Sequence, residues 1–410
     1  MALFSFFLSY LAGGPDTGGR AFELMCFSDE RVALCALNKI FGYHPTLALA
    51  LMEEAGSALA VFSGGEPEVP GHPELAAQVL PGALDWAWDE LRRVREGGFR
   101  FLGLSDEDYP PLLRECPDPP LGLYLNASCA PAEIFSLRPL VGVVGTRDLS
   151  PYGKAWCRKL VEGLSRARVP ACIVSGLALG ADGIAHRTAL ECGLPSVGVM
   201  ATGIDSVYPW QHERLAMEMV RTPGCALVTD YPLGTAPVAL NFLRRNRIIA
   251  GLVRAVVVVE SKTKGGSLMT ARYACEYGRD VYALPGRADD LRSAGCNSLI
   301  RENMAEIITT PEDLAARLGL GAPVRGAGGS WATGGKPGLT AALERQYGAG
   351  SLPLAVGQAV QECRGISVEE VAARLRQPLS EVLPAVGVLE SDGYLTTDLL
   401  RRCSVAPGWD

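Results

Sequence analysis

The stretch from Leu140 to Arg147, LVGVVGTR, decides the fold class of this chain. Its first five residues are apolar or small, which is typical of a strand that is buried on both faces. Gly145 then ends the run, and Thr146 and Arg147 follow where such a strand would stop. The pattern predicts a strand inside a parallel sheet with a polar loop at its carboxyl end.

Further short apolar runs follow this strand, separated by segments that are long enough to hold a helix. The runs are Cys172–Val174, Val197–Met200, Ala226–Val228, Ala255–Val259 and Val281–Leu284. Two of the intervening segments, Tyr152–Ala167 and Ala181–Glu191, have the pattern of crossover helices. The alternation predicts an α/β fold, with a doubly wound, Rossmann-like and mostly parallel sheet.

The regions on either side of the sheet predict smaller parts. Residues 29–115 are interpreted as a helical domain, SAM- or helix-hairpin-helix-like, with a connector, because apolar residues recur at helical spacing around a break at Gly42–Pro45. The sheet domain is assigned to 116–318, a Gly- and Ala-rich linker to 319–350 and a winged-helix-like domain to 351–410. Ser367 is expected to cap a helix of that last domain. Residues 1–28 form an extension to which no role is assigned.

Composition narrows the class of protein. The chain has 410 residues, of which 48% are hydrophobic and 20% charged, as in globular proteins with several domains. Its net charge of -7 argues against a wholly basic nucleic-acid binder, but it says nothing of local patches. The 12 cysteines form no Cys-x-x-Cys pair, so we expect reduced thiols rather than disulfides or a metal site. No apolar run is long enough to span a membrane, so we expect a cytoplasmic protein.

The loops at the carboxyl ends of the strands are the first candidate site, because ligands of open parallel sheets bind there. The candidates in these loops are Gly145, Thr146, Arg147, Ser175, Gly176, Leu177, Gly266 and Ser267. Glycine lets backbone N–H groups approach an anion, and the start of the following helix favours negative charge. One such loop is usually only a tight turn. Three loops at one edge predict a binding site for several phosphates.

The second candidate is the segment Asn241–Leu252, NFLRRNRIIAGL. Its residues that would contact a ligand are Asn241, Phe242, Arg244, Arg245, Asn246 and Arg247. Arginine binds phosphate through two nitrogens, and an aromatic face stacks on an unpaired base whatever the base is. The alternative is an amphipathic helix with solvated arginines and with Phe242 in the core. The spacing alone leaves both interpretations open.

The sequence contains neither a GxxxxGK[ST] phosphate loop nor a GxGxxG motif that opens the first helix, so no nucleotide cofactor is expected, and with no metal-ligand spacing either we expect no cofactor. Asp182 and His186 are four residues apart on an expected helix and could form an acid–base pair. A histidine at such a place more often ties its helix to a neighbouring loop. We therefore expect a protein that is not an enzyme. A nucleotide- or nucleoside-hydrolysing enzyme on a related Rossmann-like fold is kept as the alternative.

Taken together, these segments resemble the DNA-processing protein A family, also called Smf. The matching motifs are Val143–Lys154, Ser175–His186, Ala201–Leu215, Tyr231–Leu252, Val256–Gly286 and Gly295–Ile300. They occur in one order over about 160 residues of the sheet domain. The resemblance implies a protein that binds and protects single-stranded DNA without sequence preference and loads a RecA-type recombinase onto it, in natural transformation and in DNA recombination and repair. It also implies a homodimer, and it leaves contact with a single-strand-binding protein open.

The resemblance also assigns roles to residues. Arg147 resembles the arginine that meets the DNA backbone, Phe242 the aromatic that stacks on a base, and Arg245–Arg247 the RNR element of the pocket. The chain departs from the family pattern at Leu179, where a basic residue is usual, and at Asp230, where glutamate is usual. The loss of charge at Leu179 would weaken or shift DNA contacts.

Overall fold

The computed structural model describes residues 27–65, 67–321, 339–363, 365–398 and 402–406. The chain forms two compact units, Met1–Arg325 and Gly326–Asp410. The first contains a nine-stranded sheet and the second a three-stranded sheet. None of the helices in the described part of the chain has both the length and the apolar character of a membrane span.

The nine-stranded sheet has the order β1-β2-β6-β5-β4-β3-β7-β8-β9. Its strands are β1 (Arg100–Gly103), β2 (Gly122–Asn126), β3 (Leu140–Val144), β4 (Cys172–Ser175), β5 (Ser196–Val199), β6 (Ala226–Thr229), β7 (Ala255–Val258), β8 (Asp280–Ala283) and β9 (Glu306–Ile307). Strands β3 to β9 pair in parallel, whereas β1 and β2 pair antiparallel. The doubly wound α/β prediction is confirmed. From β3 the chain builds outward through β4, β5 and β6 and then returns to build β7, β8 and β9 on the other side, so the order reverses between β3 and β7.

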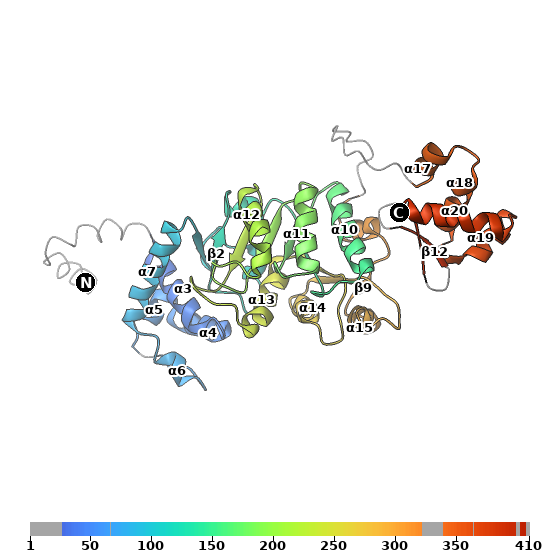
Figure 1. The fold of residues 1–410 in the computed structure, drawn as a ribbon. Helices are drawn as coiled ribbons and strands as arrows, with labels where there is room; N and C mark the ends of the chain where they lie inside the picture. The colour runs from blue at the N-terminus through green and yellow to red at the C-terminus, as the bar shows by residue number, and fades with distance from the viewer. Residues whose placement is uncertain (1–26, 66, 322–338, 364, 399–401, 407–410) are drawn as a thin grey trace. The chain divides into compact units, whose positions relative to one another are not determined.

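Helices cover both faces of this sheet, as Figure 1 shows. One layer contains α10 (Pro151–Arg166), α11 (Ala181–Glu191) and α12 (Glu213–Arg221), and the other contains α13 (Ala239–Leu252), α14 (Gly266–Glu276) and α15 (Ala294–Arg301). Alternate residues of β3 enter the two cores: Val141 and Val143 pack on the α10 side, and Leu140 and Val144 pack on the α13 side. This two-sided burial is why β3 is apolar along its whole length.

The N-terminal helices pack directly on the sheet. They are α3 (Asp29–Phe41), α4 (Pro45–Ala55), α5 (Ala58–Val61), α6 (Pro73–Ala76) and α7 (Pro81–Glu96), followed by the single turn α8 (Pro111–Arg114). The expected break is present, with α3 ending at Phe41, Gly42 as its C-cap and α4 starting at Pro45. Val32 and Cys35 of α3 share a core with Phe101 and Tyr124 of the first two strands. The sheet therefore begins before residue 116, where the sequence placed its start, and it shares its core with the helical segment.

Short elements complete the first unit, namely α9 (Pro131–Phe135), the 3-10 helix η1 (Trp210–His212) and α16 (Pro311–Arg317). The second unit consists of α17 (Leu339–Tyr347), α18 (Leu352–Glu362), α19 (Val368–Leu375) and α20 (Leu379–Ser391) with β10 (Ile366–Ser367), β11 (Leu395–Thr397) and β12 (Arg402–Val405). Ser367 caps α19 as expected, since its hydroxyl accepts a hydrogen bond from the Glu370 N–H. Helix α17 lies within the predicted linker, and its Leu339 and Leu343 are buried in the core of this unit. The winged-helix assignment stays a prediction, as do the other domain boundaries.

Candidate nucleic-acid interface

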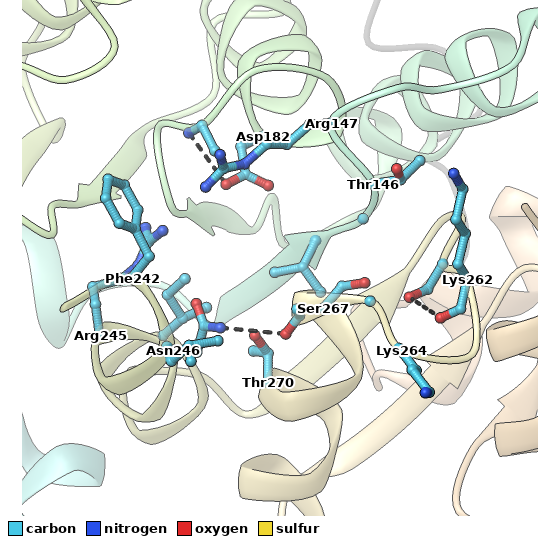
Figure 2. A pocket seen from close by; sticks show the side chains of 18 of the residues that line it. Thr146, Arg147, Asp182, Phe242, Arg245, Asn246, Lys262, Lys264, Ser267 and Thr270 are labelled. Carbon is cyan, nitrogen blue, oxygen red and sulfur yellow. Dashed lines mark hydrogen bonds between the residues drawn. The ribbon is translucent and has the colours of Figure 1, made fainter. Parts of the chain in front are cut away.

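A cavity of about 560 Å³ opens at the carboxyl edge of the sheet, where the strand order reverses between β3 and β7. The loops after β3, β4 and β7, helix α13 from Phe242 to Ile249 and the start of α14 line it, and Figure 2 shows their side chains around a common space. We call it the β3–β7 crevice. Open α/β sheets bind their ligands at such reversal points.

The crevice brings together more than half of the residues that the sequence singled out. Those that line it are Gly145, Thr146, Arg147, Phe242, Arg245, Asn246, Gly266 and Ser267. Those that lie outside its lining are Ser175, Gly176, Leu177, Asn241, Arg244 and Arg247. Residues that the sequence interpretation missed also line it, above all Lys262 and Lys264.

Helix α14 starts at the crevice wall. Gly265 is its N-cap and Gly266 its first residue, so the unpaired N–H groups of its first turn lie at the crevice. The Ser267 side chain is 8% exposed, and its hydroxyl has no hydrogen-bond partner among the described residues. Asn246 fixes this helix start by donating from Nδ2 to the Gly266 carbonyl at 3.3 Å. A helix start with free N–H groups and a free hydroxyl is a suitable site for an anion.

Three exposed cationic side chains, Arg147, Lys262 and Lys264, stand at this crevice. None of the three forms an ion pair with any carboxylate in the described part of the chain. The two lysines belong to the SKTKGGS segment directly after β7. Their position beside the glycines of the third candidate loop was the signal that would have identified them.

Phe242 is half-buried on the first turn of α13 and faces the crevice (Figure 2). The guanidinium of Arg147 lies 5.3 Å from the centre of its ring, and Tyr208 meets the ring edge-on with 5.5 Å between ring centres. A cation that can bind phosphate is therefore placed next to an aromatic ring that can stack on a base. A single nucleotide has one group for each of them: a phosphate for the cation and a base for the ring.

Arg245 lines the crevice but is only 4% exposed. Its Nη1 donates to the Val199 carbonyl, and a Cβ on Gly176 would lie 1.9 Å from the same nitrogen. Burial lowers the pKa of Arg245 to about 10, against the opposing effect of Asp182. The residue thus forms the crevice wall, and Gly176 is needed because a guanidinium packs on its backbone.

The neighbouring arginines of α13 point elsewhere. Arg247 is 4% exposed and pairs with Asp230 at 2.9 Å and with Asp118 at 3.6 Å. Arg244 donates to the Gly42 carbonyl at 2.8 Å and lies 4.6 Å from the centre of the Tyr43 ring.

Asn241 is also held by the helical segment, since it accepts a hydrogen bond from the Tyr43 hydroxyl at 2.7 Å. In this structure Asn241, Arg244 and Arg247 attach α13 to neighbouring parts of the chain. Their assignment to DNA contacts stays a prediction.

The remaining candidates support the loop after β4. The Ser175 hydroxyl donates to the Val143 carbonyl at 2.6 Å, and the Leu177 carbonyl accepts from His212 at 2.8 Å. Asp182 accepts hydrogen bonds from the N–H groups of Gly176 and Ala178 at 3.1 and 3.3 Å, and burial raises its pKa.

The suspected acid–base pair is not assembled at the crevice. Asp182 lines the crevice but His186 does not. The His186 ring contacts the Ser196 hydroxyl at 2.8 Å, at the start of β5, and burial lowers its pKa to about 3. This histidine therefore ties its helix to the sheet, which agrees with the structural interpretation of the pair.

Comparison with known proteins identifies the family. The model of the DNA recombination-mediator protein A family matches residues 100–319, which include the whole nine-stranded sheet. The chain belongs to this family. Protein Smf of Synechocystis is 43% identical over 298 residues, covering 71% of this chain and 73% of the relative. Protein Smf of Escherichia coli is 36% identical over 318 residues, covering 76% and 80%.

A solved structure also matches, that of DNA processing protein A from Streptococcus pneumoniae. Its TM-score is 0.55 at 29% identity, and the match covers 71% of this chain and 98% of that one. The resemblance inferred from the motifs is thus confirmed. Membership of the DNA recombination-mediator protein A family makes this chain a mediator of DNA recombination. The β3–β7 crevice lies within the matched residues.

Proposed function

We propose that the β3–β7 crevice binds single-stranded DNA without sequence preference. The observation that carries this proposal is the placement of a half-buried phenylalanine and three exposed cations, none with a carboxylate partner among the described residues, around the start of α14. In this arrangement Lys262, Lys264 and the helix start take phosphates, while Arg147 and Phe242 take a phosphate and its base.

The same features favour a single strand over a duplex. The ring of Phe242 can stack only on a base whose face is free, and base faces in a duplex are covered by their neighbours. Every base has a stacking face and every nucleotide a phosphate, so such contacts do not distinguish one sequence from another. Specificity for the single strand thus comes from the aromatic ring, and the cations supply attraction to any strand.

What happens to the bound strand is proposed from membership of the family alone, because no contact seen in this chain bears on it. We propose that the bound strand is protected and passed to a RecA-type recombinase, during transformation or repair, and that the protein works as a homodimer. Sedimentation of the purified chain tests the dimer, and co-purification with the recombinase tests the partnership. A monomer that retains no recombinase would remove both of these steps while leaving the crevice untouched.

The crevice is tested by fluorescence polarisation with a labelled single strand and with its duplex. Phe242→Ala and Lys264→Ala should each weaken binding to single strands of any sequence. Arg166→Ala is the matched control, because it removes an exposed charge at the end of α10, on the opposite edge of the sheet. Arg245→Ala is a poor test, since loss of a buried arginine would disturb the wall around Gly176.

Strong binding of the single strand by the wild type and the control, with weak binding by both crevice variants, would support the proposal. Equal affinities for duplex and single strand, or variants that bind like the wild type, would contradict it. The hydrolase alternative needs an acid and a nucleophile in the crevice. Asp182 is the one carboxylate among its described lining residues, and it accepts hydrogen bonds from its own loop. Release of free base from nucleoside monophosphates would revive that alternative.

A further inference from the structure

An aromatic surface continues from the crevice along the carboxyl edge of the sheet. Tyr208 touches the ring of Phe242 edge-on, with 5.5 Å between centres, and it is 44% exposed. Trp210 follows two residues later and is 75% exposed, although large aromatic side chains are normally kept from water. Both residues lie in the connection from β5 to α12, which begins at the same strand edge as the crevice loops.

We propose that Tyr208 and Trp210 extend the strand-binding surface, so that bases beyond the crevice stack on them in turn. This inference rests on the proposed function and names a second set of contacts for the same strand. We call Phe242, Tyr208 and Trp210 the aromatic row. The members of the row are neighbours. Phe242 contacts Tyr208 directly. Trp210 is two residues after Tyr208, so their backbones are at most about 7 Å apart.

The chemistry of the row suits a nucleic-acid strand better than a protein partner. Arg147 lies over Phe242 at one end, and Arg214 is exposed one helical turn after Trp210 at the other end. The nearby acids are Asp205, which accepts hydrogen bonds from the Gly234 N–H at 3.0 Å, and the exposed Glu213. Rings with cations at both ends provide stacking faces for bases and positive charge for the backbone between them.

Affinity as a function of strand length tests the row in the full-length protein. Labelled oligothymidylates of increasing length are titrated into the wild type, Trp210→Ala, Trp210→Phe and Leu137→Ala. The last is the matched control, because Leu137 is 70% exposed and lies just before β3, at the amino edge of the sheet. For Trp210→Ala we expect unchanged affinity for the shortest strands that bind and roughly ten-fold weaker affinity for long ones.

Trp210→Phe should retain most of the affinity for long strands, and Leu137→Ala all of it. If Trp210→Ala binds long strands like the wild type, the extension is overturned while the crevice proposal stands. If the wild type binds no strand of any length, the proposed function itself fails. If Trp210→Ala instead changes the sedimentation of the free protein, the tryptophan belongs to a contact between copies, and the extension is again overturned.

Discussion

The salt dependence of DNA binding follows directly from the charges at the β3–β7 crevice. Three exposed cations, Arg147, Lys262 and Lys264, line it without a carboxylate partner among the described residues. Each cation that neutralises a phosphate releases a condensed counterion, which makes binding weaker as salt rises. Arg245 adds positive potential from the wall, but it is 4% exposed and cannot reach a phosphate in this conformation.

The number of cations at the crevice sets the size of the salt effect. For single strands the slope of log affinity against log salt is about −0.7 per phosphate contact, so three contacts give about −2.1. Between about 50 and 200 mM salt the wild type should therefore lose roughly 18-fold in affinity. Lys264→Ala leaves two contacts, a slope of about −1.4 and a loss of roughly 7-fold over the same range.

Fluorescence polarisation at several salt concentrations measures these slopes for both proteins. Arg166→Ala removes one positive charge from the opposite edge of the sheet and should keep the slope of the wild type. The proposed phosphate contact of Lys264 is refuted if Lys264→Ala retains the full slope, because the lysine would then contact no phosphate. It is also refuted if Arg166→Ala lowers the slope equally, because the effect would then come from net charge and not from the crevice.

Other predictions concern stability. Gly176→Ala would place a Cβ 1.9 Å from Nη1 of Arg245, a side chain that is 4% exposed and held by the Val199 carbonyl, so it cannot swing into solvent; such overpacking costs about 1–3 kcal/mol, seen as a lower melting temperature. Arg247→Ala leaves Asp230 buried without its partner, so the free energy of unfolding in urea should fall by about 3–5 kcal/mol. The pKa of His186 is about 3 in the folded chain, below its ordinary 6.5, so the unfolded state binds the proton first and stability falls as pH drops from about 6.5 towards 3. His186→Asn should reduce this acid loss, and identical pH profiles of unfolding would contradict the assignment.

The strands and helices of the fold were predictable where buried positions follow one another in a regular pattern of apolar residues. Strands such as β3 are apolar on both faces, and the helices between them have helical spacing, so their positions matched the expectations closely. Three strands of the sheet, β1, β2 and β9, were missed. Strand β2 (GLYLN) is buried over its first four residues and carries an apolar pattern, so its sequence does contain a signal. The other two are weaker: β9 has two residues, both exposed at the sheet edge, and β1 is a four-residue strand that ends in glycine. Their place in the sheet is decided by pairing with neighbours, which a single sequence does not reveal.

The site was only partly predictable, because the arginines of α13 differ in surroundings and not in type. Successive residues of a helix point about 100° apart, so Arg244, Arg245 and Arg247 cannot all face one ligand. That geometry could have been read from the spacing. Which one faces the crevice depends on partners such as Asp230 and the Gly42 carbonyl, which lie far away in the sequence. Lys262 and Lys264 lie in a loop and so belong to no helical or strand pattern, and only their place beside Gly265 and Gly266 marks them.

The charge of the whole chain determines which contact should matter most. With a net charge of -7 the protein offers DNA little general attraction, so the crevice must supply the binding energy. At about 0.15 M salt one phosphate contact contributes about 0.8 kcal/mol on the counterion scale, whereas one stacked base contributes about 1–3 kcal/mol. Phe242→Ala should therefore weaken binding more than Lys264→Ala, and the gap should widen as salt rises because stacking is not screened. Paired titrations at low and high salt measure this gap. A larger loss from the lysine variant at high salt would show that the ring is packed as core and stacks on no base.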